Sequence, residues 1–214
     1  VPWGVKDLDQ FYNSGAYQRV SNRYAPPNVY TSIAKLNEIE TAKGFTSSTF
    51  TGFTRKKESP YKAPSAATTS KPKTTAKPDT RTATSTIDVA ISSSLYNNHY
   101  DYDAATNSYK RSEGGQPHMV VDAAGVQKQI TPKVIITLVL PYGIQSDGKH
   151  SDYGTIGAGQ MFVFQDGTVT AGTWTKSANN AQFQFADNEG HPLLLNPGQT
   201  WLTAVDAAGD VTYK

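Results

Sequence analysis

Cysteine is absent from the chain of 214 residues. Its absence excludes a thiol nucleophile, a disulfide framework and zinc sites built on thiolates. Long apolar runs are lacking too, because the longest, 134–140, is interrupted by Thr137 and is far shorter than the ~20 residues that span a bilayer. The chain begins Val-Pro-Trp without a basic region followed by an apolar one. We therefore expect a piece of a longer precursor, with any export signal or anchor upstream.

An excess of one charge is also lacking, since 20 basic residues face 18 acidic ones and the net charge is only +2. This balance argues against a nucleic-acid partner. Charged residues make up 18% of the chain, and Thr, Ser, Ala, Gly, Asn and Gln dominate the remainder. Such a composition is typical of an extracytoplasmic β-rich protein. No Gly-rich loop opens a helix in the manner of a phosphate site, so we expect no nucleotide and no other cofactor.

The first part of the chain contains one clear helix signal, in "TSIAKLNEIETAKG" (31–44). Thr31 or Ser32 can cap its start, and Gly44 supplies its stop. Residues 54–85 then contain four prolines and no Leu, Ile, Val or Phe, which predicts a flexible Pro/Thr/Lys-rich loop. We therefore expect three parts: the end of a first-half domain (1–53), this loop (54–85) and a β-rich C-terminal domain (86–214).

From residue 86 onward the pattern is that of strands. "HYDYD" and "NSYKR" flank a short turn and predict a hairpin, "KVIITLVLPY" is a buried strand, and Asp166-Gly167 lies between two strand-like runs. We count about seven or eight strands against one N-terminal helix. The predicted class is α+β, mostly β, with an antiparallel β-rich domain.

Several motifs follow one another in a specific order. They are Tyr100-x-Tyr102-Asp103, Tyr109-x-Arg111, His118, Asp122, Gly157-x-Gly159, "FQDG" (164–167), "GTWTK" (172–176) and "LNPGQTW" (195–201). This set resembles the YerB-like lipoproteins, an envelope family of Gram-positive-type bacteria whose halves are domains of unknown function. Upstream, "YQRVSNRYAPPNVYTS" (17–32) is similar to the end of the family's first half. The resemblance covers residues 9–50 and 86–205 approximately.

What the resemblance implies is location rather than chemistry. It implies an extracytoplasmic, cell-surface lipoprotein that faces the wall, attached to the membrane only through an upstream lipidated cysteine that this chain lacks. It implies partners in the envelope, either a wall polymer or another envelope protein. It offers no catalytic residue that could be carried over.

The stretch 100–122 contains the best candidates for chemistry. Arg111 is a fixed cation, His118 titrates near neutrality, and Asp122 could orient the imidazole of His118. If the hairpin brings His118 over Arg111, an anionic ligand could bind there. The alternative is structural: Arg111 pairs with Asp101 or Asp103, and His118 and Asp122 hold a Gly-Gly loop.

Tyrosines are the better candidates for a glycan- or peptide-binding surface, whereas Trp174 and Trp201 alternate with apolar residues and are expected in the core. The loop "DGKHSD" (147–152) is compatible with a metal site but equally with a polar surface loop, and we predict no metal site and no catalytic residue. The predicted ligand-contacting residues are Tyr17, Arg19, Tyr102, Tyr109, Arg111, His118 and Asp122.

Three functions stay open from the sequence. The leading one is an extracytoplasmic, non-enzymatic envelope module that binds a wall polymer or a protein partner. The second is a hydrolase or transferase acting on wall glycan or a lipid-linked polymer, with His118 and Asp122 as acid–base groups. The third is a purely structural domain that supports the absent first half.

Overall fold

The computed structural model describes residues 8–22, 28–45, 47, 51–63, 81–122 and 124–214. The chain divides into two compact units, Val1–Thr51 and Gly52–Lys214. Within the described residues no helix is long and apolar enough to cross a membrane.

The first unit is small and contains the predicted helix. Its elements are η1 (Ser14–Ala16), β1 (Gln18–Arg19), β2 (Val29–Tyr30) and α1 (Ile33–Ala42). The Ser32 hydroxyl accepts a hydrogen bond from the backbone N–H of Lys35 at 3.2 Å, which is the expected N-terminal cap. Gly44 has φ +70°, the left-handed conformation that ends many helices. Both predicted helix ends are therefore confirmed.

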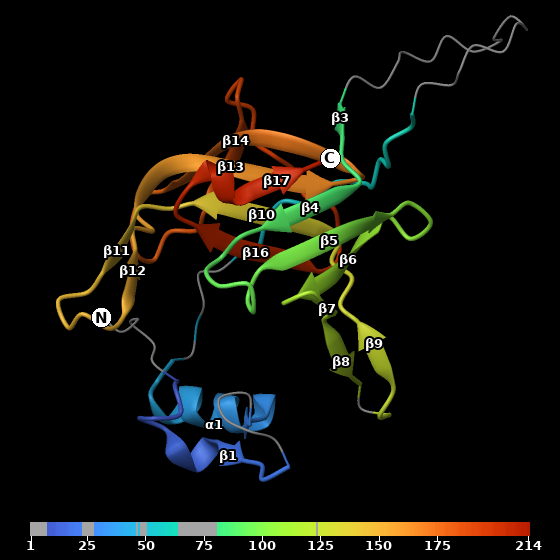
Figure 1. Ribbon diagram of the computed structural model, residues 1–214. Helices are drawn as coiled ribbons and strands as arrows, with labels where there is room; N and C mark the ends of the chain where they lie inside the picture. The colour runs from blue at the N-terminus through green and yellow to red at the C-terminus, as the bar shows by residue number, and fades with distance from the viewer. Residues whose placement is uncertain (1–7, 23–27, 46, 48–50, 64–80, 123) are drawn as a thin grey trace, which may run out of the picture. The chain divides into compact units, whose positions relative to one another are not determined.

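The second unit contains two main sheets, two separate hairpins and one short helix, η2 (Ala208–Asp210) (Figure 1). The larger sheet has the strand order β15-β14-β13-β10-β16, with β3 pairing to β14. Its strands are β3 (Thr82–Ala83), β10 (Val134–Val139), β13 (Gly157–Gln165), β14 (Thr168–Lys176), β15 (Gln184–Asp187) and β16 (Thr200–Val205).

The smaller sheet has the order β17-β4-β5-β6-β7. Its strands are β4 (Thr86–Val89), β5 (Asn98–Asp103), β6 (Ser108–Glu113), β7 (Gln116–Pro117) and β17 (Val211–Tyr213). The hairpins are β8 (Met119–Val121) with β9 (Gln127–Gln129), and β11 (Tyr142–Ile144) with β12 (Ser151–Tyr153).

The class predicted from the sequence, α+β and mostly β, is confirmed, although the strands outnumber the predicted seven or eight. The additional strands are short, like β7 and β8, and two or three residues are too few to show an alternating pattern. Most pairs are antiparallel as expected, but β10 pairs with β16 in parallel, in a register that joins Val134 to Thr200.

Both predicted hairpin turns are present. Residues 104–107 connect β5 to β6, and Asp166-Gly167 connects β13 to β14 in a two-residue turn. Asp166 and Gly167 have φ +59° and +69°, the left-handed values that the tightest hairpin turns need at both central positions. Asp and Gly tolerate these values, which is why the dipeptide predicts the turn.

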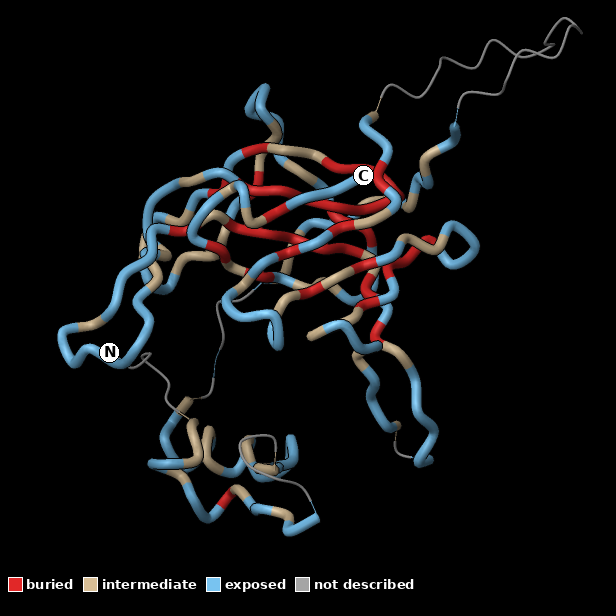
Figure 2. Tube along the Cα trace, in the orientation of Figure 1, coloured by how far each residue is buried: buried red, intermediate tan, exposed pale blue. Residues whose placement is uncertain are grey.

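The core has two layers, one on each face of the larger sheet (Figure 2). The first lies between the two sheets, where Ile135 and Phe164 of the larger sheet pack with Tyr100 and Tyr109 of the smaller one. The second lies on the opposite face and includes Trp174, as predicted for this tryptophan. Strand β10 contributes to both layers because successive side chains point to opposite faces.

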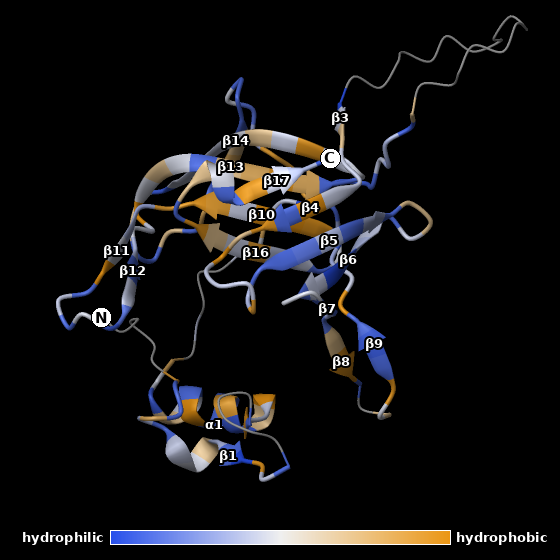
Figure 3. Ribbon diagram, in the orientation of Figure 1, coloured by the Kyte–Doolittle hydropathy of each residue, from blue (hydrophilic) through white to orange (hydrophobic). Residues whose placement is uncertain are grey.

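The β8–β9 hairpin differs from the sheets because its apolar side chains are exposed (Figure 3). Met119, Val120 and Val121 are each more than two-fifths exposed.

Candidate functional site

The predicted site residues of the first unit line a common small cavity. Tyr17 and Arg19 both border a space of about 150 Å³ next to Gln10 and Val29. The Tyr17 hydroxyl donates to the carbonyl of Leu8, and Arg19 Nη1 donates to the side-chain oxygen of Asn28 at 2.8 Å. These two residues are therefore brought together at one small cavity.

In the second unit Arg111 and His118 are in contact, the arrangement that the sequence analysis considered as a condition for a ligand site. Arg111 is only 3% exposed, and its Nη2 donates to Asn98 Oδ1 at 2.5 Å. Its guanidinium carbon lies 4.2 Å from the centre of the Trp201 ring, a cation–π contact. Nη1 contacts His118 Nδ1 and lies 3.3 Å from Glu113 Oε2. The side chain is thus buried in the protein instead of pairing with Asp101 or Asp103, the structural alternative considered above.

This environment favours the neutral form of His118. Burial lowers its pKa below the ordinary value of 6.5, the neighbouring Arg111 lowers it further, and Glu113 acts in the opposite direction. A neutral imidazole can accept an Arg111 N–H through Nδ1, which leaves its proton on Nε2. The pair is therefore suited to holding strands together and does not present a free cation.

Asp122 does not orient this imidazole. Its Oδ1 accepts the backbone N–H groups of Ala124 and Val126, each at 3.0 Å, and its Oδ2 pairs with Lys128 at 2.8 Å. These contacts close the β8–β9 turn. The predicted acid–base pair of His118 and Asp122 is therefore not assembled.

Tyr102 and Tyr109 lie beside each other, with ring centres 5.1 Å apart, but they belong to the core region rather than to an exposed face. Tyr109 and Tyr100 have no exposed surface. The Tyr109 hydroxyl accepts the backbone N–H of Gly167 at 3.1 Å, and burial raises its pKa. The Tyr102 hydroxyl donates to Asn107 at 2.8 Å. The expectation that Tyr109 contacts a ligand is thus corrected, because its ring and that of Tyr100 fill the space between the sheets.

A buried polar network centred on Asp166 was not predicted. Asp166 is 1% exposed, and its Oδ2 pairs with Lys56 Nζ at 2.5 Å. Its Oδ1 accepts the side-chain amides of Asn196 at 2.7 Å and Asn107 at 2.9 Å, and the backbone N–H of Ser59 at 3.2 Å. Burial alone would raise the pKa of Asp166, but the hydrogen bonds from Lys56 and the two asparagines outweigh it and lower the pKa.

This network holds the described beginning of the expected loop 54–85 against the β-rich unit. The backbones of Arg55 and Leu195 form an isolated parallel β-bridge, and the N–H of Tyr61 donates to the Asp166 carbonyl at 2.8 Å. Residues 64–80 of the same stretch lie outside the described residues. Both carboxylate oxygens and the backbone carbonyl of Asp166 are used within the protein, so the network acts as an anchor rather than as a ligand site.

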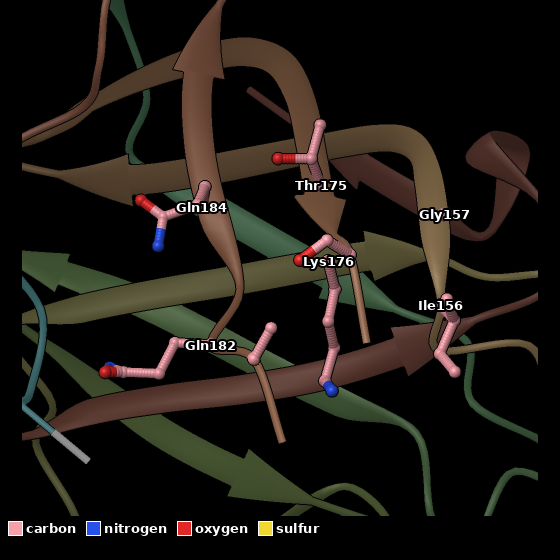
Figure 4. Close-up of a pocket in the computed structure, with 8 residues that line it drawn as sticks. Ile156, Gly157, Thr175, Lys176, Gln182 and Gln184 are labelled. Atoms are coloured by element: carbon pink, nitrogen blue, oxygen red, sulfur yellow. The ribbon is translucent and has the colours of Figure 1, made fainter. Parts of the chain in front are cut away.

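A surface pocket of about 520 Å³ lies where β13, β14 and β15 begin or end (Figure 4). The lining residues are Ile156, Gly157, Thr175, Lys176, Ser177, Ala181, Gln182 and Gln184. Figure 4 shows the Lys176 side chain running between Ile156 on one side and the segment of Gln182 and Gln184 on the other. The lining offers one cation, two amides and two hydroxyls, and it contains no carboxylate.

The Lys176 ammonium is positioned by backbone oxygens. It donates to the carbonyl of Ala178 and to that of Asn179, the second at 2.7 Å. An ammonium has three donors, so one N–H remains for a ligand. Carbonyl oxygens carry no net charge, and the positive charge of Lys176 is therefore not neutralised by these partners. A pocket of this kind can bind an anionic or hydroxyl-rich group, but it has no acid–base pair for catalysis.

Comparison with known families identifies the second unit. The family described as protein of unknown function (DUF3048), C-terminal domain, matches residues 87–202, more than half of the chain. The chain belongs to this family. Its structure is also similar to the crystal structure of the YerB protein from Bacillus subtilis, with a TM-score of 0.67 and 20% identity. The alignment covers 93% of this chain and 59% of that protein, so the chain spans less than two thirds of its length. No curated protein matches the chain. The predicted membership of the YerB-like family is confirmed.

The glycine motifs of this DUF3048 domain shape the strands around the pocket. Gly159 lies opposite Trp174 in the β13–β14 register, and a Cβ atom at Gly159 would come within 2.7 Å of the indole nitrogen. Because Gly159 has no side chain, the indole N–H of Trp174 can approach and donate to the Val139 carbonyl at 2.9 Å. At Gly172 a Cβ atom would lie 2.0 Å from the Ala186 carbonyl oxygen, so the β14–β15 pairing requires glycine there.

The loop considered for a metal contains a simple pair, in which His150 Nδ1 contacts Asp147 Oδ2. Across the part of the chain that the structure describes, no group of three or more metal-ligating side chains is assembled. Sequence reasoning missed the Lys176 pocket because its lining residues come from β13, β14, β15 and the segments next to these strands. The available signal was the polar pair Gln182 and Gln184 following "GTWTK".

Proposed function

We propose that this chain is part of an extracytoplasmic, non-enzymatic cell-envelope module that binds an anionic wall polymer through the Lys176 pocket. The observation that carries the proposal is an ammonium held by two carbonyl oxygens in a pocket that has no carboxylate in its lining. Gln184 adds an amide group that can hydrogen-bond to hydroxyl and phosphate oxygens, whereas the Gln182 amide donates to the Gly52 carbonyl. Phosphate- or carboxylate-bearing, hydroxyl-rich polymers match this set of donors.

The extracytoplasmic location is supported by the composition and by the resemblance to the YerB-like lipoproteins. Low charge, no cysteine and many Ser, Thr and Asn residues fit a protein of the cell surface. Attachment through an upstream lipid anchor is part of the same proposal. Two other roles remain predictions made from the sequence alone. They are binding to another envelope protein and structural support of a further domain.

The contacts of His118 and Asp122 argue against the hydrolase or transferase alternative. A general acid–base pair needs two groups that converge on one reacting atom. Here His118 faces Arg111 and Glu113, whereas Asp122 is committed to Lys128 and the β8–β9 turn.

Sedimentation with isolated Gram-positive cell walls tests the proposed binding. Walls are used before and after chemical removal of their phosphate-containing polymers. We expect the chain to sediment with untreated walls, and Lys176→Met to weaken this binding at least about tenfold, equivalent to 1.4 kcal/mol. Methionine keeps an unbranched side chain in place of the lysine stem and removes only the ammonium.

Lys128→Met is the matched control, because it removes the same charge from an exposed position of β9, where the lysine is 64% exposed. Its binding should stay within about twofold of that of the unmodified chain, since exposed ion pairs contribute little. The proposal is wrong if the unmodified chain does not bind untreated walls, or if Lys176→Met binds them equally well.

A further inference from the structure

A second groove of the β-rich unit differs from the Lys176 pocket in its chemistry. It has a volume of about 520 Å³ and lies between the end of β4, the β11–β12 hairpin and the end of β16 with η2. The groove contains aromatic, hydroxyl and carboxylate groups from Ser92, Tyr142, Ser151, Tyr153, Asp206 and Asp210. Its lining contains no lysine, arginine or histidine.

Two tyrosines form the aromatic side of the groove. Tyr142 and Tyr153 are direct partners across β11 and β12, with ring centres 5.1 Å apart and ring planes inclined by 54°. Tyr142 is 46% exposed, so its ring is available to a ligand. Its hydroxyl lies 3.3 Å from the Ser151 hydroxyl, which places two hydrogen-bonding groups beside the rings. Exposed rings with neighbouring hydroxyls suit a sugar, whose C–H face packs on aromatic carbon while its hydroxyls bond to polar groups.

Two carboxylates form the other side. Asp206 follows directly after β16, and its charge is one of the causes that raise the pKa of Tyr153, which lines the same groove. Asp210 belongs to η2, where its Oδ2 accepts the backbone N–H of Ala207 at 3.2 Å. This bond leaves Oδ1 of Asp210 without a role in capping the turn. The groove therefore combines a negative charge with an aromatic surface, the two features that attract an organic cation.

We propose that this groove binds an amino sugar. The protonated amine would pair with Asp206 and Asp210, the sugar ring would pack on Tyr142, and its hydroxyls would bond to the serine and tyrosine hydroxyls. The Lys176 pocket has the opposite charge and selects a different ligand, so this proposal does not depend on the proposed function. A lysine side chain of a peptide carries the same ammonium but lacks the hydroxyls, and the groove offers four hydroxyl groups to a sugar.

Titration by isothermal calorimetry with three probes tests the proposal. The probes are a glucosamine tetramer, the N-acetylglucosamine tetramer with the same rings but no charge, and tetralysine with charge but no rings. The titrations are run at about pH 5.5, where the amines of the glucosamine tetramer and of tetralysine are protonated. We expect the glucosamine tetramer to bind at least tenfold more tightly than either other probe.

Variants of the groove make the test specific. We expect Asp206→Asn to weaken binding of the glucosamine tetramer at least tenfold and Tyr142→Ala at least fivefold. Asp152→Asn is the matched control, because Asp152 lies between Ser151 and Tyr153 on β12 and so points to the other face of the hairpin. It should bind within twofold, as should Lys176→Met, which separates this site from the wall-polymer pocket. Thermal unfolding of Tyr142→Ala shows whether the domain remains folded.

Four results would overturn the proposal. Equal binding of the acetylated tetramer would show stacking without recognition of the amine. Equal binding of tetralysine would show a site for any ammonium group. Unchanged binding by Asp206→Asn, or no binding of the glucosamine tetramer at all, would show that the groove is not the site.

Discussion

Replacing Asp166 by Asn tests whether the buried network anchors residues 54–63 to the sheets. Asparagine keeps the size of the side chain and tolerates the left-handed backbone at φ +59°, so the turn itself is preserved. The substitution changes the group that faces Lys56. The charged carboxylate oxygen that lies 2.5 Å from the ammonium is replaced by either the NH₂ group or the uncharged oxygen of the amide. The substitution therefore removes a charge-assisted hydrogen bond without creating a large cavity.

The expected cost is about 2–3 kcal/mol in the free energy of unfolding. Hydrogen bonds to charged groups contribute about 1.5–3 kcal/mol. Removing one partner of a fully buried pair costs about 3–5 kcal/mol, but Lys56 is 24% exposed and can regain part of its hydration, which favours the lower range. For a unit of this size the midpoint of thermal unfolding should fall by about 4–12 °C. Asp152→Asn, an exposed aspartate of β12, should change stability by less than about 0.5 kcal/mol.

Urea unfolding at several pH values is the assay. The pKa of Asp166 is lower in the folded protein than its ordinary 3.8, so its contribution is present above that value and is lost as the pH falls through the lower, folded pKa. The unmodified chain should therefore lose more stability on acidification below about pH 4 than Asp166→Asn does. Trypsin should also cleave Asp166→Asn faster after Lys57 or Lys62, which follow the anchored lysine. A loss below about 0.5 kcal/mol, or an identical acid dependence in both proteins, would refute the anchoring role.

Three further predictions concern other contacts of the β-rich unit. In an NMR pH titration His99 should titrate above 6.5, because its hydrogen bonds to two aspartates raise its pKa, whereas His118 should titrate below 6.5 because burial and Arg111 lower its pKa. His99 is 38% exposed, so its ion pairs should stabilise the protein only slightly. This stabilisation should be complete below pH 6.5 and decline as the pH rises through the higher pKa of the folded state. A free energy of unfolding that does not change over this pH range would contradict the prediction. Arg111→Lys should destabilise the domain by about 1–3 kcal/mol in urea unfolding, because lysine lacks the planar group that stacks on the indole and reaches several acceptors; full stability would exclude this role. Gly172→Ala should lower the unfolding midpoint or the yield of folded protein, since its Cβ would lie 2.0 Å from a backbone oxygen, whereas Gly209→Ala, with nothing within 4 Å of the added carbon, should not.

Local signals in the sequence account for the parts of the fold that were predicted correctly. The Ser32 cap and Gly44 define the helix through hydrogen bonds within a few residues. Asp166-Gly167 predicts its turn because two adjacent residues must adopt left-handed angles. The apolar run of β10 predicts a strand buried on both faces, and this is observed.

The site residues were harder to predict because their roles depend on distant partners. A contact between Arg111 and His118 was one of two arrangements considered, and it is present, but Trp201 and Asn98 bury the guanidinium and remove it from the surface. Tyr109 was expected on an exposed face, yet the alternation of β6 alone does not say which face another sheet will cover.

By itself, then, the sequence determined the β-rich class, the helix, the hairpin turns and the family, because each of these rests on residues close together in the chain or on an ordered set of motifs. Only the tertiary structure decided which polar groups are buried and which line an accessible pocket. Lys56 and Asp166 are 110 positions apart in the chain but form an ion pair, and the Lys176 pocket requires three strands in register. Contacts between residues this far apart in the chain depend on how the sheets pack. The burial of a side chain and its charged partners are set by other elements of the fold, and the residues next to it in the sequence do not specify them.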